Sequence, residues 1–247
     1  MTPKTIIAAM HPVGIKNSKS SEPLAVFKTA PDSPQFWIQA EISAVQRELS
    51  QVARATADQI NASITRLRIR CRASAESCAD TPYMTETEAF YSVFGGPISV
   101  YRSSLAHNWG AEVKNISEIY VYNLTTINPG VIEKGYLIEN PRIIGHEMGH
   151  VYGNIVKQNL NVDPFSALSV QLLRLSYGSP TDSGRFFGFY GGWESWQFGS
   201  PAFSPTETFA DMYLAWVYNH WDANALGTYR QNWMQNRIRM WTWDLIH

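Results

Sequence analysis

Residues 143–154 read IIGHEMGHVYGN, and the interpretation of the whole chain starts from this stretch. It contains the pattern H-E-x-x-H, formed by His146, Glu147 and His150. If the stretch is helical, residues four apart lie on the same face, so both imidazole rings project to one side about a turn apart. Two histidines at this spacing can reach one zinc ion, with Zn–N distances of about 2.0–2.1 Å.

The sequence around the motif predicts that it is helical. Asn140 followed by Pro141 is typical of a helix start, with asparagine as N-cap and proline at the first helical position, and the helix is expected to end near Gln158. Each glycine in such a helix costs roughly 1 kcal/mol of helix stability relative to alanine. A helix that carries this cost is expected to need glycine so that another backbone can approach it closely. Three glycines recur at every fourth position: Gly145, Gly149 and Gly153.

Glu147 follows the first histidine and would lie beside the metal, where it can accept a proton from water. The alternative is a buried helix that carries two hydrogen-bonded histidines and no metal. A zinc site of this kind needs a third protein ligand from elsewhere in the chain. A third histidine in the pattern H-E-x-x-H-x-x-G-x-x-H is excluded, because that position is Val156.

The segment ETFAD offers the best third ligand. Glu207 and Asp211 are four apart and share a face of a predicted helix. Glu207 is expected to bind the zinc, while Asp211 accepts the free ring N–H of a ligating histidine and so fixes the orientation of that ring. Glu194 is the alternative ligand. Glu207 also fits a capping box with Ser204, but capping makes no demand on Asp211.

With these residues, H-E-x-x-H followed by a helical E-x-x-A-D, the chain resembles the gluzincin group of zinc metallopeptidases over roughly residues 90–220. The segment ETFADMYLAW is similar to the corresponding segment of the lethal-factor-like branch. The separation between His150 and Glu207 in the sequence is longer than in many gluzincins. The resemblance implies a zincin-like fold, a single catalytic Zn²⁺ held by His146, His150 and Glu207, and Glu147 as general base.

The predicted fold class is α+β. A small mixed or antiparallel sheet should precede the H-E-x-x-H helix, and a mainly helical part should follow it. We expect residues 1–34 to form an extended arm or linker and residues 35–247 to form one zincin-like domain, with its β-containing part ending near residue 139. The expected helices cover 35–57, with a continuation past Ile60 as the alternative, 140–158, a short piece within 165–175, 204–219 and 223–247. The expected strands cover 90–94, 98–101 and 119–122.

Residues 159–203 have few regular patterns but many aromatic side chains, which is typical of a functional loop rather than a disordered one. A peptidase of this kind needs a second polar group to stabilise the oxyanion. Tyr190, in GFYGGW, is the candidate, because the neighbouring glycines would let it move into the site. The alternative is that these aromatic residues only pack the loop onto the domain.

The composition excludes some partners. The chain has 247 residues and a formal net charge of −1, which gives no electrostatic reason to bind nucleic acid. No apolar run reaches the roughly 18 residues that a membrane span needs, and the apolar patch at 5–10 is too short for the core of a secretory signal. Cys71 and Cys78 are close enough for a disulfide, which would indicate an oxidising compartment, and a secreted protein is expected.

The expected function is zinc-dependent hydrolysis of peptide bonds by an endopeptidase, with a peptide or protein as substrate. Two alternatives remain at the level of sequence. One is a non-catalytic zinc-containing interaction module on a zincin scaffold. The other is a zinc hydrolase that acts on a non-peptide amide. Sequence predicts neither the cleavage specificity nor the oligomeric state.

Overall fold

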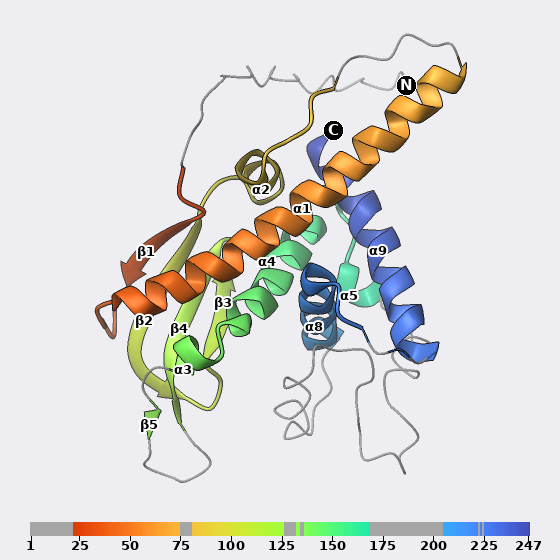
Figure 1. Cartoon of the computed structure of the whole chain (residues 1–247). Helices are drawn as coiled ribbons and strands as arrows, with labels where there is room; N and C mark the ends of the chain where they lie inside the picture. The colour runs from red at the N-terminus through yellow and green to blue at the C-terminus, as the bar shows by residue number, and fades with distance from the viewer. Residues whose placement is uncertain are drawn as a thin grey trace, which may run out of the picture.

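The computed structural model describes residues 22–74, 81–125, 132–133, 136–167, 205–221, 223 and 225–247. These residues form a mixed sheet and a group of helices, so the α+β prediction is confirmed. Figure 1 shows the sheet on one side, the long helix α1 crossing it, and α4 lying beside α1.

The sheet has the strand order β1-β2-β4-β3 and combines parallel with antiparallel pairing. β2 (Ile98–His107) lies in the middle and pairs in parallel with both β1 (Ala25–Thr29) and β4 (Glu118–Thr125). β3 (Ala111–Asn115) is antiparallel to β4, and the short β5 (Ile132–Glu133) also pairs with β4. The strands predicted at 98–101 and 119–122 are therefore present, and both are longer than predicted.

One face of the sheet is apolar and packs against the helices. Alternate residues of the central strands, such as Val100 and Ile119, are fully buried, as period-2 patterning requires. Arg102 is buried on the same face and donates from Nη2 to Glu41 Oε1 of α1 at 3.0 Å and to Asn123 Oδ1 at 2.8 Å. This satisfied ion pair connects α1 with the sheet.

Helix α1 (Gln39–Ser74) is longer than the predicted 35–57 helix. The apolar spacing continues past its expected end, because Ile60 and Ile64 are both buried in the core. The strand predicted at 90–94 is wrong, because these residues belong to helix α2 (Glu86–Phe94). A capping box between Thr85 and Glu88 starts α2, and these local signals outweigh the aromatic run that favoured a strand.

The helices predicted at 140–158, 204–219 and 223–247 correspond in outline to α4 (Arg142–Leu160), α8 (Pro205–Tyr218) and α9 (Ala225–Ile246). Helix α5 (Pro164–Ala167) overlaps only the start of the short helix predicted within 165–175, and residues 168–175 lie outside the described residues. Helix α3 (Tyr136–Glu139) was not predicted. The start of α4 differs from the prediction by one residue. Pro141 occupies the N-cap position and no side chain caps the helix, so Asn140 is not the cap.

Several expectations concern the ends and loops of the chain. β1 falls inside the stretch that was expected to be an arm or linker, where it pairs with β2 along an edge of the sheet, while residues 1–21 lie outside the described residues. Cys71 is disulfide-bonded, and Cys78 lies outside the described residues. Within the described part of the chain, no helix has the length and apolarity of a membrane span.

Candidate metal centre

Helix α4 carries the H-E-x-x-H motif, and its glycines allow α8 to lie directly against it. A Cβ added at Gly149 would lie 2.7 Å from Cα of Ala210 and 3.0 Å from its carbonyl oxygen. Only glycine at position 149 permits this approach of the two backbones. The close contact brings the first turns of α8 to the same side of α4 as the two histidines. At Gly149 the glycine therefore has the role that the sequence predicts, which is to let another backbone approach.

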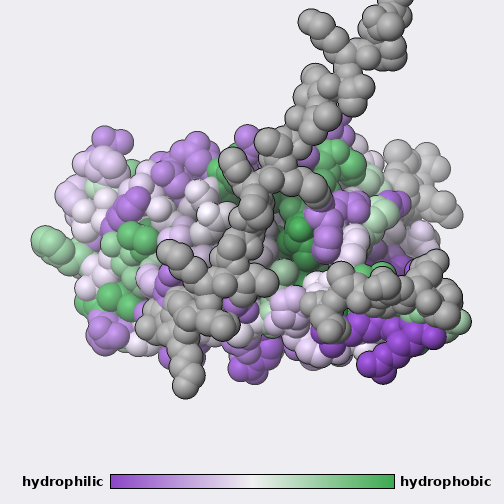
Figure 2. Space-filling view, turned by 90° about the horizontal axis from the view of Figure 1, so that it is seen from above, coloured by the Kyte–Doolittle hydropathy of each residue, from purple (hydrophilic) through white to green (hydrophobic). Residues whose placement is uncertain are grey.

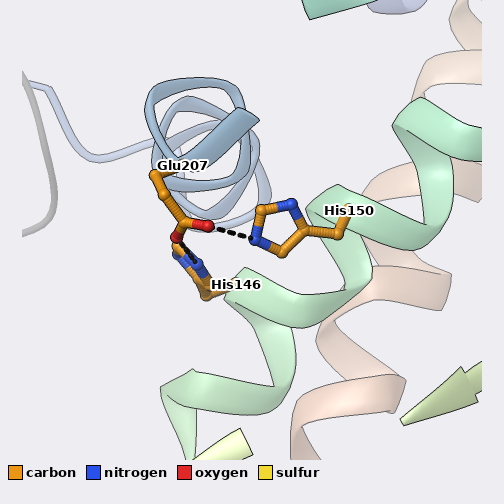
Figure 3. Close-up of side chains that lie close together, drawn as sticks. All are labelled: His146, His150 and Glu207. Atoms are coloured by element: carbon orange, nitrogen blue, oxygen red, sulfur yellow. Dashed lines mark hydrogen bonds and ion pairs between the residues drawn. The ribbon is translucent and has the colours of Figure 1, made fainter. Parts of the chain in front are cut away.

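His146 and His150 of α4 and Glu207 of α8 point toward one another (Figure 3). Nε2 of His146 lies 3.1 Å from one carboxylate oxygen of Glu207, and Nε2 of His150 lies 3.4 Å from the other. One ligand atom from each residue falls within 4.8 Å of the others. The structure thus brings together the three residues that the sequence predicts as ligands, from segments that are far apart in the chain.

Asp211 lies one turn after Glu207 and contacts the opposite nitrogen of the His146 ring. Its Oδ1 is 2.7 Å from Nδ1, and both side chains are buried. This contact favours a proton on Nδ1 and orients the ring so that Nε2 lies toward Glu207. The predicted positioning role for Asp211 therefore has the geometry that it requires.

Electrostatics at the cluster follow from burial and from these contacts. Burial lowers the pKa of His146, but the charge of Asp211 and the hydrogen bonds to Asp211 and Glu207 outweigh it and hold this pKa well above its ordinary value. For Glu207, burial raises the pKa, and the hydrogen bonds from His146 and His150 overcome this effect and hold the pKa far below its usual range. A carboxylate held as an anion beside two ring nitrogens suits a cation.

Glu147 is 5% exposed, and burial raises the pKa of its carboxyl above the ordinary value. The charges of His150 and His146 lower this pKa, whereas those of Glu207 and of Glu112, on the edge strand β3, raise it further. Strand β3 contacts the motif helix α4. Tyr122 of β4 donates a hydrogen bond to Glu112. Burial and this bond raise the pKa of the Tyr122 phenol, so Tyr122 keeps its proton near neutral pH.

The donor set can be tested against the metal that the motif implies. Two imidazole nitrogens and one carboxylate are a known ligand set for catalytic zinc, which leaves one coordination position open. Bonds of about 2.0–2.2 Å in tetrahedral geometry place ligand atoms roughly 3.3–3.6 Å apart. The ligand atoms of the cluster lie within 4.8 Å of one another, so they would have to approach by at most about 1.5 Å to hold zinc. Within the residues that the structure describes, this is the one group of three such ligands.

The sequence candidate for the second polar group is Tyr190, with Tyr213 and Tyr218 of α8 as alternatives. Tyr190, and the alternative ligand Glu194, lie outside the described residues, as does Ser204 of the expected capping box. Tyr213 is buried and stacks on Tyr152, with ring centroids 5.3 Å apart. Tyr218 donates its hydroxyl hydrogen bond to Glu48 of α1.

Sequence reasoning missed Glu112 and Tyr122, which come close to the motif only through the pairing of β3 with β4. The segment AEVKN of β3 is short and polar, and only the alternation of its residues could have indicated an edge strand. Comparisons with known protein families, with curated proteins and with solved structures found no match.

Proposed function

We propose that the chain is a zinc-dependent hydrolase of peptide bonds. The observation that carries this proposal is the convergence of His146, His150 and Glu207 from two helices, with Asp211 on the far nitrogen of His146. A non-metal role explains the hydrogen bonds within the cluster. It does not explain why the base Glu147 sits beside it in a buried position.

Each side chain has one role in this proposal. The two histidines and Glu207 would hold zinc, and Asp211 would keep the proton of His146 on Nδ1. Zinc bound there would supply Lewis acidity, which lowers the pKa of water and polarises a carbonyl group. Glu147 would accept the proton of the attacking water on a carboxylate oxygen and deliver it to the leaving amine. Its raised pKa suits both steps.

The fold supports the resemblance to gluzincins as a proposal. The motif helix α4 packs against a mixed sheet and contacts its antiparallel edge strand β3. An edge strand offers unpaired backbone groups to an extended peptide, which would present a peptide bond to the centre. We therefore infer a zincin-like peptidase acting on extended polypeptide, with its finer subfamily left to experiment.

The decisive experiment compares the native chain with Glu147→Gln. We expect one zinc per chain in both proteins, and hydrolysis of a mixed peptide library by the native chain only. Loss of a general base typically lowers the rate by about 10²–10⁴-fold, while the ligands remain intact. Chelation should abolish hydrolysis and added zinc should restore it.

Two outcomes would overturn the proposal. If the chain cannot be loaded with stoichiometric zinc, α4 is a buried helix whose two histidines form hydrogen bonds and bind no metal. A chain that binds zinc but hydrolyses no peptide would instead be a non-catalytic module or an amidohydrolase with a non-peptide substrate. A screen of small amides would separate those two.

A further inference from the structure

A groove runs between α1 and α9, on residues that take no part in the metal cluster. Its volume is about 680 Å³. Ser63, Arg66, Leu67 and Arg70 line it from α1, and they follow one another at helical spacing. The stripe on α9 has the same spacing and runs from Trp233 to Asp244, so the groove is formed by the outer edges of two packed helices.

A second hollow, of about 430 Å³, continues the first along α1 toward residue 55. The two share Arg66, Asn236 and Arg239 as lining residues. On α1 the combined lining extends from residue 55 to residue 70, which corresponds to about 22 Å at the rise of an α-helix. This length suits one face of a helix of about 15 residues.

The charge of the groove is opposite to that of the whole chain. Four arginines line the larger hollow, against one acid, Asp244, although the chain has a net charge of −1. Over both hollows together the lining holds four arginines and two acids, Asp58 and Asp244. Arg237 lies over the ring of Trp233, 5.8 Å from its centroid, which holds the guanidinium next to apolar surface.

Apolar surface is exposed between these charges. Leu67 and Met240, one from each helix, are 39% and 42% exposed. Figure 2 shows the molecule from above, which is the side toward which α1 and α9 run in Figure 1. Hydrophobic and strongly hydrophilic side chains lie next to one another on this side. Guanidinium groups pair with carboxylates in bidentate geometry, while the leucine, methionine and tryptophan side chains accept apolar ones.

We propose that this groove binds an acidic amphipathic polypeptide segment of a partner protein, with acidic side chains on the arginines and apolar side chains between the helices. Polypeptide is favoured over nucleic acid because apolar side chains alternate with the charges and because the chain as a whole is slightly acidic. The first 21 residues of this chain contain three lysines and no acid, so their charge does not match the groove.

The test measures binding of a labelled synthetic peptide to the full chain by fluorescence anisotropy. The probe is a peptide of about 15 residues with glutamate and leucine at helical spacing, and a matched peptide has glutamine in place of glutamate. We expect the glutamate peptide alone to bind, with affinity that falls as salt is added. Arg66→Gln with Arg239→Gln should weaken binding by about tenfold or more, because both exposed arginines line both hollows.

Arg47→Gln is the matched control, because Arg47 is an exposed arginine of α1 outside the groove. Binding should be unchanged in this variant, and circular dichroism should confirm that all variants are folded. Equal binding of the glutamine peptide, or full affinity in the double variant, would overturn the proposal. So would displacement of the peptide by a single-stranded oligonucleotide or by anionic lipid vesicles that bind more tightly at the same arginines. Peptidase activity enters none of these measurements, so they stand apart from the proposed function.

Discussion

At the scale of single residues, the contact between Asp211 and His146 is the one on which the proposed metal site depends most for the orientation of a ligand. A carboxylate at 2.7 Å from Nδ1 fixes both the tautomer and the direction of Nε2. Such a contact contributes little net stability to the fold, because replacing both groups by apolar side chains of similar shape can be nearly neutral. In the proposed zinc site its value would lie in orienting Nε2 toward the metal.

Asp211→Asn should therefore weaken zinc binding without abolishing it. Asparagine keeps an acceptor for the Nδ1 proton but loses the negative charge, and changes of this kind typically cost about 10–100-fold in metal affinity. Competition with a chromophoric chelator measures the change. Glu207→Ala should lose more, because it removes a proposed ligand, whereas Glu147→Gln should keep the native affinity. An Asp211→Asn chain that binds zinc as tightly as the native chain would contradict the positioning role.

Residue spacing could predict this cluster because all its members lie on two helices. The interval of four in H-E-x-x-H and again in Glu207–Asp211 places side chains on one face without any knowledge of tertiary structure. Glu112 and Tyr122 could not be found in this way. They meet across two strands, and their contact depends on the register of β3 with β4, which no local pattern specifies.

At the scale of elements, the helix pair α4–α8 shows why glycines occupy the motif helix. The added Cβ at Gly149 meets the backbone of Ala210, which cannot move without shifting α8. At Gly145 the nearest atom is Cδ1 of Leu214, at 2.7 Å, the far end of a flexible side chain. The two glycines thus look equivalent in sequence but differ in the packing that they serve.

We expect Gly149→Ala to destabilise the chain by about 1–3 kcal/mol, because overpacking against backbone exceeds the roughly 1 kcal/mol that alanine contributes as a helix former. Gly145→Ala is the matched substitution on the same helix and should cost clearly less, since Leu214 can change rotamer. Urea unfolding followed by circular dichroism measures both. Equal costs at the two positions would show that α8 can move away from α4.

Element predictions failed where local signals competed. Residues 90–94 contain an aromatic run that favours a strand, yet they form the end of α2. The capping box at Thr85 and Glu88 starts this helix, and Gly95, with φ of 76°, ends it. The buried residues of α2 are at positions 89, 90, 93 and 94, which is a helical spacing rather than alternation. The capping box and Gly95 are visible in the sequence, and they outweigh the strand preference of the aromatic residues.

At the scale of the whole molecule, Glu48 connects three helices. It belongs to α1 and is 5% exposed. Its two carboxylate oxygens lie 2.7 and 2.8 Å from the Tyr218 hydroxyl at the end of α8 and share the one proton that this hydroxyl donates. Its Oε2 would lie 3.3 Å from a Cβ at Gly145 of α4. Burial raises the pKa of Glu48, and the hydrogen bond from Tyr218 and the charge of Arg142 offset this only in part.

This raised pKa predicts how stability depends on pH. Between the ordinary carboxyl pKa, about 4.3, and the higher value in the folded state, the folded chain keeps a proton that the unfolded chain has lost. The Glu48 contribution to stability therefore decreases as pH rises through this window, by about 1.4 kcal/mol for each unit by which the pKa is raised. Above the folded-state pKa the loss is complete and stays constant.

Glu48→Gln removes this titration and keeps an oxygen that accepts from Tyr218. We expect the stability of the variant relative to the native chain to improve between about pH 4 and about pH 8, as measured by urea unfolding at both values. Glu86→Gln, at an exposed ion pair with Arg54, is the control, because such pairs contribute little and the difference from the native chain should be small at both pH values. If the Glu48→Gln difference stays flat or moves the other way, the folded protein already holds Glu48 as an anion at low pH. The junction of α1, α4 and α8 would then be stabilised by that charge rather than strained by it.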